Sequence, residues 1–236
     1  MKEIKISDGS EKNVPMTYLS SALTSAAKDF GGEVCLYADK HRKTITVKIS
    51  DEYEDFLRGE AEDKISDVIA VKYKYDFFVK KIPASGLNEI EREILYSALI
   101  SADIDEDKRY IARKLRGFYE YAVDGIYNFR LSALKRKWSE IVGYIPPYFP
   151  SGRLNDFVSY LIGEKKGKAV TVENGNVYDK HFNLLRRTEL TGDISEGRIL
   201  REALLSGCGE LRVLSPVPES EERYLRTYFM GRITFC

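Results

Sequence analysis

The sequence predicts an α+β protein with a small N-terminal mixed unit, a central helical bundle and a C-terminal strand-rich α/β unit. Three observations predict this class: alternating apolar residues near the N-terminus, long apolar stripes at helical spacing in the middle, and short strand-like runs near the C-terminus. We place the domains at 1–50, 51–163 and 164–236, because the pattern changes at these points.

The sequence pattern of the N-terminal region predicts one strand, one helix and a hairpin. The strand is Glu3–Ile6, and the helix Pro15–Phe30 has a proline in its first turn and two glycines at its end. Val34–Tyr37 and Thr44–Ile49 then form the hairpin around a polar turn. Alternation along the second hairpin strand places three residues on one face: Ile45, Val47 and Ile49.

The central region opens with an apolar stripe at helical spacing. Its members are Leu57, Ala61, Ile65, Val68, Tyr75, Val79 and Ile82. A strand is the competing interpretation, because Val71–Phe77 alternates with period two. We favour a helix because the helical stripe is much longer than the alternation.

Two further helices are predicted before residue 124. Leu87–Ala102 is the first, and Asp103–Asp107 is a polar break that can cap the second. The second helix runs to about Val123.

The stretch Asp124–Pro150 is predicted to form the central scaffold helix. Asp124 caps its start and Pro146-Pro147 stop it. Its core-facing stripe consists of Tyr127, Leu131, Leu134, Trp138, Ile141, Val142 and Ile145. On the outer face, helical pitch makes Phe129 and Arg136 neighbours. An uncovered Phe129 would mark an interaction patch.

The C-terminal region returns to strands after a short helix at Leu154–Ile162. Ala169–Glu173 and Asn176–Tyr178 flank Asn174-Gly175, a pair that favours a two-residue hairpin turn. Phe182–Arg186 is predicted to add a third strand.

A helix and a strand–helix–strand unit are predicted to complete the chain. Asp193–Glu196 is a capping-box pattern that opens a helix, which Gly207 ends. The last three elements are Leu211–Leu214, a helix at Ser220–Met230, and Arg232–Phe235. If the two strands join one sheet in parallel, their crossover should be right-handed.

Charge is balanced overall but not along the chain. Lys+Arg and Asp+Glu both number 37, so net charge does not indicate a nucleic-acid or membrane partner. Counting residues, Asp51–Asp107 has 7 basic and 16 acidic, and Lys108–Pro150 has 9 basic and 3 acidic. We expect these segments to pack together and neutralise each other. The alternative is an exposed basic surface, for which one helix face offers a row: Arg109, Arg113 and Arg116.

The sequence indicates a cytoplasmic protein without membrane insertion. Its three cysteines are widely separated and include no CxxC, as is typical of a reducing compartment. The N-terminal segment has no apolar signal region, and the longest uncharged run, Val14–Ala27, is too short to span a bilayer.

Residues that could carry chemistry have structural interpretations that we prefer. His41 and His181 lie in predicted turns without a partner at metal-ligand spacing. The alternating aspartates of Asp103–Asp107 lack the glycine and glutamate of a calcium loop. Cys208, between two glycines, is interpreted as a small filler, and Ser215–Ser220 as a plain connector. The sequence therefore predicts no catalytic residue, metal ligand or cofactor.

Several segments together resemble a known family. They include NEIEREILYSAL, DGIYNFRLSALKRKW, LNDFVSYL, VYDKHFNLL and a C-terminal strand–helix–strand ending in RITFC. In this order they resemble the YtxC-like proteins associated with endospore formation in Firmicutes, most specifically through Gly125–Leu131. The resemblance covers roughly Asp51–Cys236. It implies a cytoplasmic protein of a spore-forming bacterium, in a family without an assigned reaction, so no catalytic role carries over to any residue.

One departure from the family pattern bears on the surface of the scaffold helix. The family's central helices continue toward a Glu-rich stretch, whereas here PPYFPSG intervenes and the preceding residues are basic. This puts in doubt whether the surface around Lys135–Pro150 has the same role.

Three hypotheses for function follow from these observations. The first is a non-enzymatic, sporulation-associated interaction or scaffold protein with an unknown protein partner. The second is a protein that binds nucleic acid or an anionic ligand through Arg109, Arg113 and Arg116. The third is an enzyme with an unrecognised site between the N- and C-terminal units.

Overall fold

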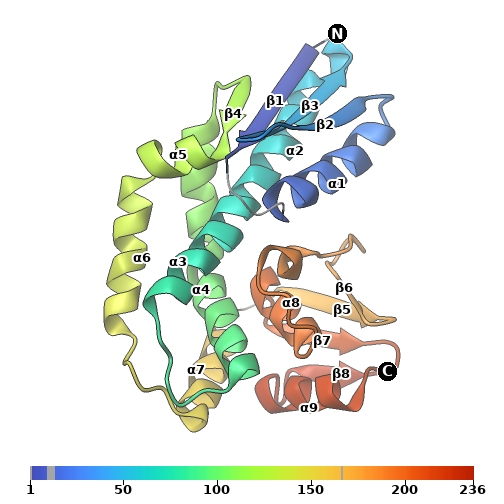
Figure 1. Cartoon of the computed structure of the whole chain (residues 1–236). Coiled ribbons are helices and arrows are strands. Elements are labelled where there is room, and N and C mark those ends of the chain that lie inside the picture. The colour runs from blue at the N-terminus through green and yellow to red at the C-terminus, as the bar shows by residue number, and fades with distance from the viewer. Residues whose placement is uncertain (1, 10–13, 166) are drawn as a thin grey trace. The chain divides into compact units, whose positions relative to one another are not determined.

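The computed structural model describes residues 2–9, 14–165 and 167–236 and shows an α+β fold with two mixed sheets (Figure 1). The predicted fold class is confirmed. The chain forms two compact units, each built from two segments: Met1–Tyr73 with Asp105–Ser139, and Lys74–Ile104 with Glu140–Cys236. The sequence-based division at residues 50 and 163 stays a prediction.

The first unit contains a four-stranded sheet in the order β2-β3-β1-β4. Its strands are β1 (Lys2–Asp8), β2 (Glu33–Ala38), β3 (Lys43–Ile49) and β4 (Glu120–Ala122). β3 is antiparallel to both β1 and β2, whereas β4 is parallel to β1. The predicted N-terminal strand and hairpin are confirmed, and β4 is a strand that the sequence interpretation missed.

Helix α1 (Val14–Lys28) packs against β2 and β3 (Figure 1). Its apolar residues Leu19 and Leu23 are buried, as are the three residues predicted to share one face of β3, Ile45, Val47 and Ile49. Period-two alternation therefore identified the core face of this strand correctly.

A long helical segment follows the sheet: a 3₁₀ turn (Asp51–Tyr53), α2 (Glu54–Asp67), a π-helical segment (Val68–Tyr73) and α3 (Lys74–Lys81). The helix prediction at 71–77 is confirmed against the strand alternative. Consecutive residues Val68–Lys72 are all buried, so neither periodicity describes them. The wide π turn changes the helical spacing at this point.

Helix α4 (Glu89–Leu115) consists of two helices joined across a kink at Asp103, which has non-helical angles (φ −133°, ψ 19°). The predicted break between two helices is therefore confirmed, although only Asp103 of the polar run Asp103–Asp107 leaves the helical conformation. The predicted end of the second helix is wrong: it ends before Val123, because Gly117 adopts φ 86° and Tyr121 pairs with Ile6 in the sheet.

The predicted scaffold helix is two helices, α5 (Val123–Arg130) and α6 (Ser132–Tyr144), separated by Leu131 at φ −112° and ψ 31°. The predicted cap is also wrong: Ala122 is the N-cap, and Asp124 lies in the first turn. The core stripe is confirmed at its centre, where Leu131, Leu134 and Trp138 are buried. The helix ends before the two prolines, as predicted.

Oppositely charged segments meet within the first unit. Lys108 pairs with Asp63 and Asp67 at 2.8 Å each, and Lys137 pairs with Glu106 at 2.9 Å. These pairs support internal neutralisation of the acidic and basic segments.

The second unit contains the sheet β6-β5-β7-β8. Its strands are β5 (Ala169–Glu173), β6 (Asn176–Tyr178), β7 (Glu210–Val213) and β8 (Ile233–Phe235). Its remaining helices are α7 (Ser151–Glu164), a 3₁₀ turn at Arg187–Leu190, α8 (Arg198–Ser206) and α9 (Glu219–Tyr228). β7 is parallel to β5 and to β8, so the last strand–helix–strand is a parallel pair as expected.

The hairpin turn between β5 and β6 was predicted correctly, but the strand predicted after β6 was not. Asn174 and Gly175 adopt φ 50° and 73°, as the predicted two-residue turn requires. Phe182–Arg186 does not form a third strand; a single bridge joins Leu184 to Tyr178. Phe182 adopts φ 64°, which interrupts an extended chain.

The start of α8 depends on a distant carboxylate rather than on the predicted capping box. Its N-cap is Gly197, at φ 69° and without a side-chain cap. The buried Glu221 of α9 accepts hydrogen bonds from the backbone N–H groups of Arg198 (2.9 Å) and Ile199 (3.2 Å). At the other end, Gly207 at φ 70° terminates the helix as predicted.

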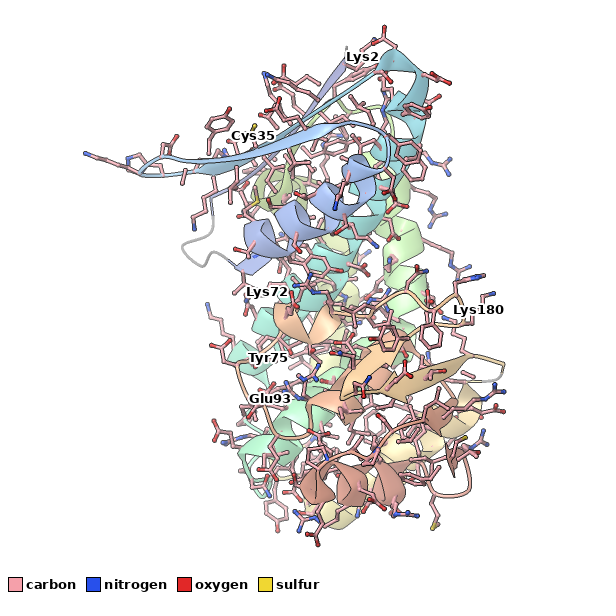
Figure 2. The ribbon with its side chains drawn as sticks, turned by 90° about the vertical axis from the view of Figure 1, so that its right-hand side faces the viewer. Lys2, Cys35, Lys72, Tyr75, Glu93 and Lys180 are labelled. Atoms are coloured by element: carbon pink, nitrogen blue, oxygen red, sulfur yellow. The ribbon has the colours of Figure 1, made fainter. Side chains whose placement is uncertain are left out.

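A buried polar network lies within the second unit. The Tyr75 hydroxyl donates to Glu93 at 2.6 Å, and the Arg201 guanidinium donates to the same carboxylate at 3.3 Å (Figure 2). Glu202 accepts from the backbone N–H groups of Arg187 and Thr188 at 2.8 Å each. Long-range hydrogen bonds thus connect α8 to α4 and to the 3₁₀ turn, and connect α4 to α3.

No helix in the described part of the chain combines the length and apolar character needed to cross a bilayer.

Candidate functional site

The predicted basic row lies at the solvent-exposed C-terminal end of α4, with Arg109 and Arg113 in the helix and Arg116 directly after its last residue, Leu115. Arg109, Arg113 and Arg116 are all exposed and line a surface hollow of about 550 Å³ together with Glu106 and Ala112. The prediction that they share one face therefore agrees with the structure.

Two of these arginines also have local contacts. The Nε–H of Arg109 donates to the carbonyl of Asp105 at 3.1 Å, and the Arg113 guanidinium lies 5.9 Å from the centre of the Tyr110 ring. Local contacts of this kind are common for arginines on a helix surface, so the row is a weak indication of a site.

The predicted interaction patch of Phe129 and Arg136 differs in the structure from the predicted arrangement. Phe129 has an exposed fraction of 86%, and Arg136 is exposed as well. However, the neighbour relation was derived for one unbroken helix, and the break at Leu131 places the two residues on different helices. Phe129 is an exposed aromatic residue, but its pairing with Arg136 is not supported.

The alternating aspartates have structural partners. Asp103 pairs with the buried ammonium of Lys74. The buried Asp107 accepts from the indole N–H of Trp138 at 2.9 Å and pairs with Lys137 at 3.0 Å. Among the described residues, no group of three or more His, Cys, Asp or Glu side chains is placed to hold a metal ion.

The cysteines and histidines form no nucleophile–base pair among the contacts described. Cys208 is buried, and burial raises the pKa of its thiol to about 12, so the thiol is protonated at neutral pH. This agrees with its interpretation as a filler. Cys236 is exposed, and both His41 and His181 are exposed in turns.

The most distinctive concave surface is a basic hollow in the second unit, with a volume of about 630 Å³. The residues before β5, the loop after β6 and the end of α8 form its walls. Its charged lining residues are four cations and one carboxylate: Lys168, Lys180, Arg187, Arg212 and Asp179. We call this surface the basic hollow.

Asp179 organises the loop that carries one wall. Its Oδ1 accepts from the backbone N–H groups of His181 (2.8 Å) and Asn183 (2.9 Å), and its Oδ2 accepts from the Asn183 side chain at 3.1 Å. Although burial raises the pKa of this carboxyl, the hydrogen bonds outweigh burial and lower it overall. The ionised Asp179 therefore stabilises a tight turn that presents Lys180 (Figure 2).

An exposed aromatic ring lies at the same hollow. Phe182 lines it with an exposed fraction of 56% and stacks on Tyr178, the two ring centres being 5.0 Å apart. Its φ of 64° is unfavourable for a bulky residue. Strained residues of this kind cluster at binding sites, which makes this ring a marker of function.

The cations of the basic hollow differ in how they are held. Arg187 donates from Nη1 to the carbonyl of Leu205 at 2.8 Å, near the C-terminus of α8, where a cation is favoured. Lys180 and Arg212 are exposed. The hydrogen-bonded Arg187 and the exposed Lys180 and Arg212 together give the hollow a positive electrostatic potential that favours phosphate groups.

The charged residues of the basic hollow were not predicted from the sequence. Its cations are far apart in sequence, and Arg212 reaches the hollow only because β7 pairs with β5. One local signal was present: Asp179 followed by a short polar run is typical of a side-chain-stabilised turn.

Comparison with known proteins gives no match to a family model, to a curated protein or to a solved structure. The resemblance to YtxC-like proteins therefore stays a hypothesis, and the geometry alone must support a function.

Proposed function

We propose that this chain is a non-enzymatic binding protein and that its ligand is single-stranded nucleic acid, bound at the basic hollow. The observation that carries the proposal is the exposed Phe182 ring, kept in a strained conformation beside four cationic side chains. Nucleic acid offers both a phosphate for the cations and a flat base for the ring. The family resemblance adds sporulation in a spore-forming bacterium as the cellular setting of this proposal.

Size and chemistry favour a nucleotide of a single strand over a duplex. A hollow of about 630 Å³ is in the range of small-ligand sites and suits one splayed-out nucleotide. The stacked pair Tyr178–Phe182 extends an aromatic surface, and stacking on such surfaces tolerates every base. We therefore expect binding with little sequence preference.

The test is fluorescence anisotropy with a labelled single-stranded oligonucleotide of about 12 nucleotides, titrated at several salt concentrations. Lys180→Ala combined with Arg212→Ala should weaken binding about tenfold and reduce the salt dependence, because fewer phosphate contacts release fewer counterions. Both residues are exposed, so the fold should tolerate the change.

A charge-matched control is available on α3. Lys80→Ala with Lys81→Ala removes the same two positive charges from exposed positions of the same unit. This variant should bind like the original chain. Absence of binding at low salt, or equal loss in both double variants, would remove the proposal.

A second candidate surface is the row of Arg109, Arg113 and Arg116, favoured by its exposure around one hollow at the C-terminal end of α4. If this row binds the nucleic acid, the triple Ala variant loses affinity while the variant of the basic hollow retains it. The same titration therefore separates the two surfaces.

A further inference from the structure

We propose that two copies of this chain pair antiparallel through β2, which extends the sheet of the first unit across a two-fold axis. β2 lies at the edge of the sheet, and within the described chain no strand pairs with its outer side. The N–H and C=O groups along the outer side of such a strand form a template for another strand.

β2 differs from the other sheet edges in length. It has six residues, whereas β4, β6 and β8, the other edge strands of the two sheets, have three each. Short edges offer too few backbone groups to hold a partner strand, and proteins use them to prevent association. Among the edge strands in the described part of the chain, only β2 lacks this protection.

The composition of β2 also lacks the usual protection. The strand reads EVCLYA, with no proline or lysine and with Glu33 as its one charged residue. Leu36 and Tyr37 have exposed fractions of 47% and 60% (Figure 2 labels the neighbouring Cys35). Two adjacent exposed apolar residues and an unpaired strand edge favour addition of a strand.

Charge and symmetry select a second copy in one register. A parallel copy would set Glu33 beside its own equivalent, which is repulsive. An antiparallel pair with two-fold symmetry places one residue opposite itself. An axis at Leu36 sets Glu33 opposite Asp39, again repulsive, whereas an axis at Cys35 sets Val34 opposite Leu36 and Glu33 opposite Tyr37. Of these two registers, which pair most of β2, only the one centred on Cys35 avoids opposed carboxylates.

The small area of the interface between the two β2 strands predicts a dimer of low affinity. A ladder of about six residues a side buries less than the roughly 1,200 Å² of a stable interface. We expect a dissociation constant of about 10–100 μM, so the dimer forms at high protein concentration.

The first test is sedimentation velocity of the full chain over concentrations from about 5 μM to about 500 μM. The mass should rise from that of one chain toward that of two. Leu36→Lys, which puts a charge on the edge strand, should remain a monomer throughout. Met230→Lys, at a residue with an exposed fraction of 82%, is the control and should dimerise like the original chain.

The second test uses Cys35 as a reporter of register, in a Cys236→Ser background that removes the exposed C-terminal thiol. An added thiol oxidant can join directly opposed cysteines in an intermolecular disulfide, because opposed Cβ atoms approach to about 4.5 Å and a disulfide needs about 3.5–4.5 Å. Covalent dimers that disappear in Cys35→Ser support the register.

Three outcomes would overturn the proposal. They are a monomer at every concentration, a dimer that Leu36→Lys leaves intact, and a monomer that instead accepts a β-strand peptide of another protein at this edge. Circular dichroism of each variant shows that the fold is retained, so a lost dimer cannot be confused with unfolding.

Discussion

Glu221 is a single residue that fixes where a helix begins. Its buried carboxylate accepts the first two backbone N–H groups of α8, although α9 carries it. Glu221→Ala should reduce the free energy of unfolding by about 2 kcal/mol, because two N–H groups lose their acceptor. Urea denaturation at pH 7 measures the loss, and an unchanged midpoint would contradict this role.

The same residue predicts a pH dependence. Burial raises the pKa of the Glu221 carboxyl above its ordinary value. The folded state therefore takes up this proton before the unfolded state, and the residue's contribution to stability increases as pH falls from the raised pKa to the ordinary one. Relative to Glu221→Gln, which cannot titrate, the original chain should gain stability on acidification. Parallel denaturation curves at each pH measure the difference.

Gly209 and Gly143 form a matched pair. A Cβ at Gly209 would overlap the backbone carbonyl oxygen of Lys165, which cannot move without shifting the chain before β5. A Cβ at Gly143, in α6, meets nothing within 4 Å. Gly209→Ala should cost about 3 kcal/mol, and Gly143→Ala should stabilise by about 0.5 kcal/mol. Thermal denaturation compares them directly.

Substitution of Phe182 should change the stability of the fold and the affinity for the oligonucleotide in opposite directions. Phe182→Gly removes the ring and relieves the positive φ of 64°, so it should raise the free energy of unfolding by about 1 kcal/mol. If the ring stacks on a base, the same variant should weaken binding of the oligonucleotide roughly tenfold. A variant that is more stable and binds equally well would show that the ring has no role in binding.

At the scale of elements, local sequence patterns predicted the structure correctly where tertiary contacts favour the same conformation. The turn at Asn174-Gly175 requires only that these two residues adopt positive φ, which depends on their own residue types. The break at Leu131 and the strand Glu120–Ala122 were not predictable in this way, because β4 forms only by pairing with β1, more than 100 residues earlier. Tertiary contacts override helical propensity at such positions.

The buried pair of Arg201 and Glu93 connects α8 to α4 within the second unit. Exposed fractions are 1% for Arg201 and 7% for Glu93, so either charge is costly when left alone. Arg201→Met should destabilise by about 3–5 kcal/mol. Combining it with Glu93→Gln should cost clearly less than the sum of the two single changes, since no uncompensated charge remains. A double-mutant cycle measures this coupling, and strict additivity would contradict it.

At the scale of the whole molecule, the candidate site was less predictable than the fold. Fold class depends on periodicity, which each segment shows by itself. The basic hollow depends on Lys168, Arg187 and Arg212 meeting across different elements, and spacing rules cannot detect such a meeting. The predicted row of Arg109, Arg113 and Arg116 was detectable because the three residues lie within eight positions of the chain, two of them in α4 and the third directly after it. Sequence reasoning is thus biased toward sites that lie on a single element.

The two units should unfold together. Chain continuity supports this: the π segment of the first unit continues into α3 of the second without a loop, and α4 passes from the second unit into the first directly after its kink at Asp103. Melting one unit would break hydrogen bonds inside helices that continue into the other. Trp138, the single tryptophan, is buried in the first unit, so its fluorescence reports that unit alone.

Gly209→Ala tests this cooperativity, because it acts in the second unit while the fluorescence reports the first. The midpoint of thermal unfolding should fall by about 6–12 °C, equally by Trp138 fluorescence and by circular dichroism, which follows all helices. Independent units would instead leave the fluorescence midpoint unchanged while circular dichroism shows an early phase. Coincident shifts would show that destabilising the unit with the basic hollow also destabilises the unit with β2.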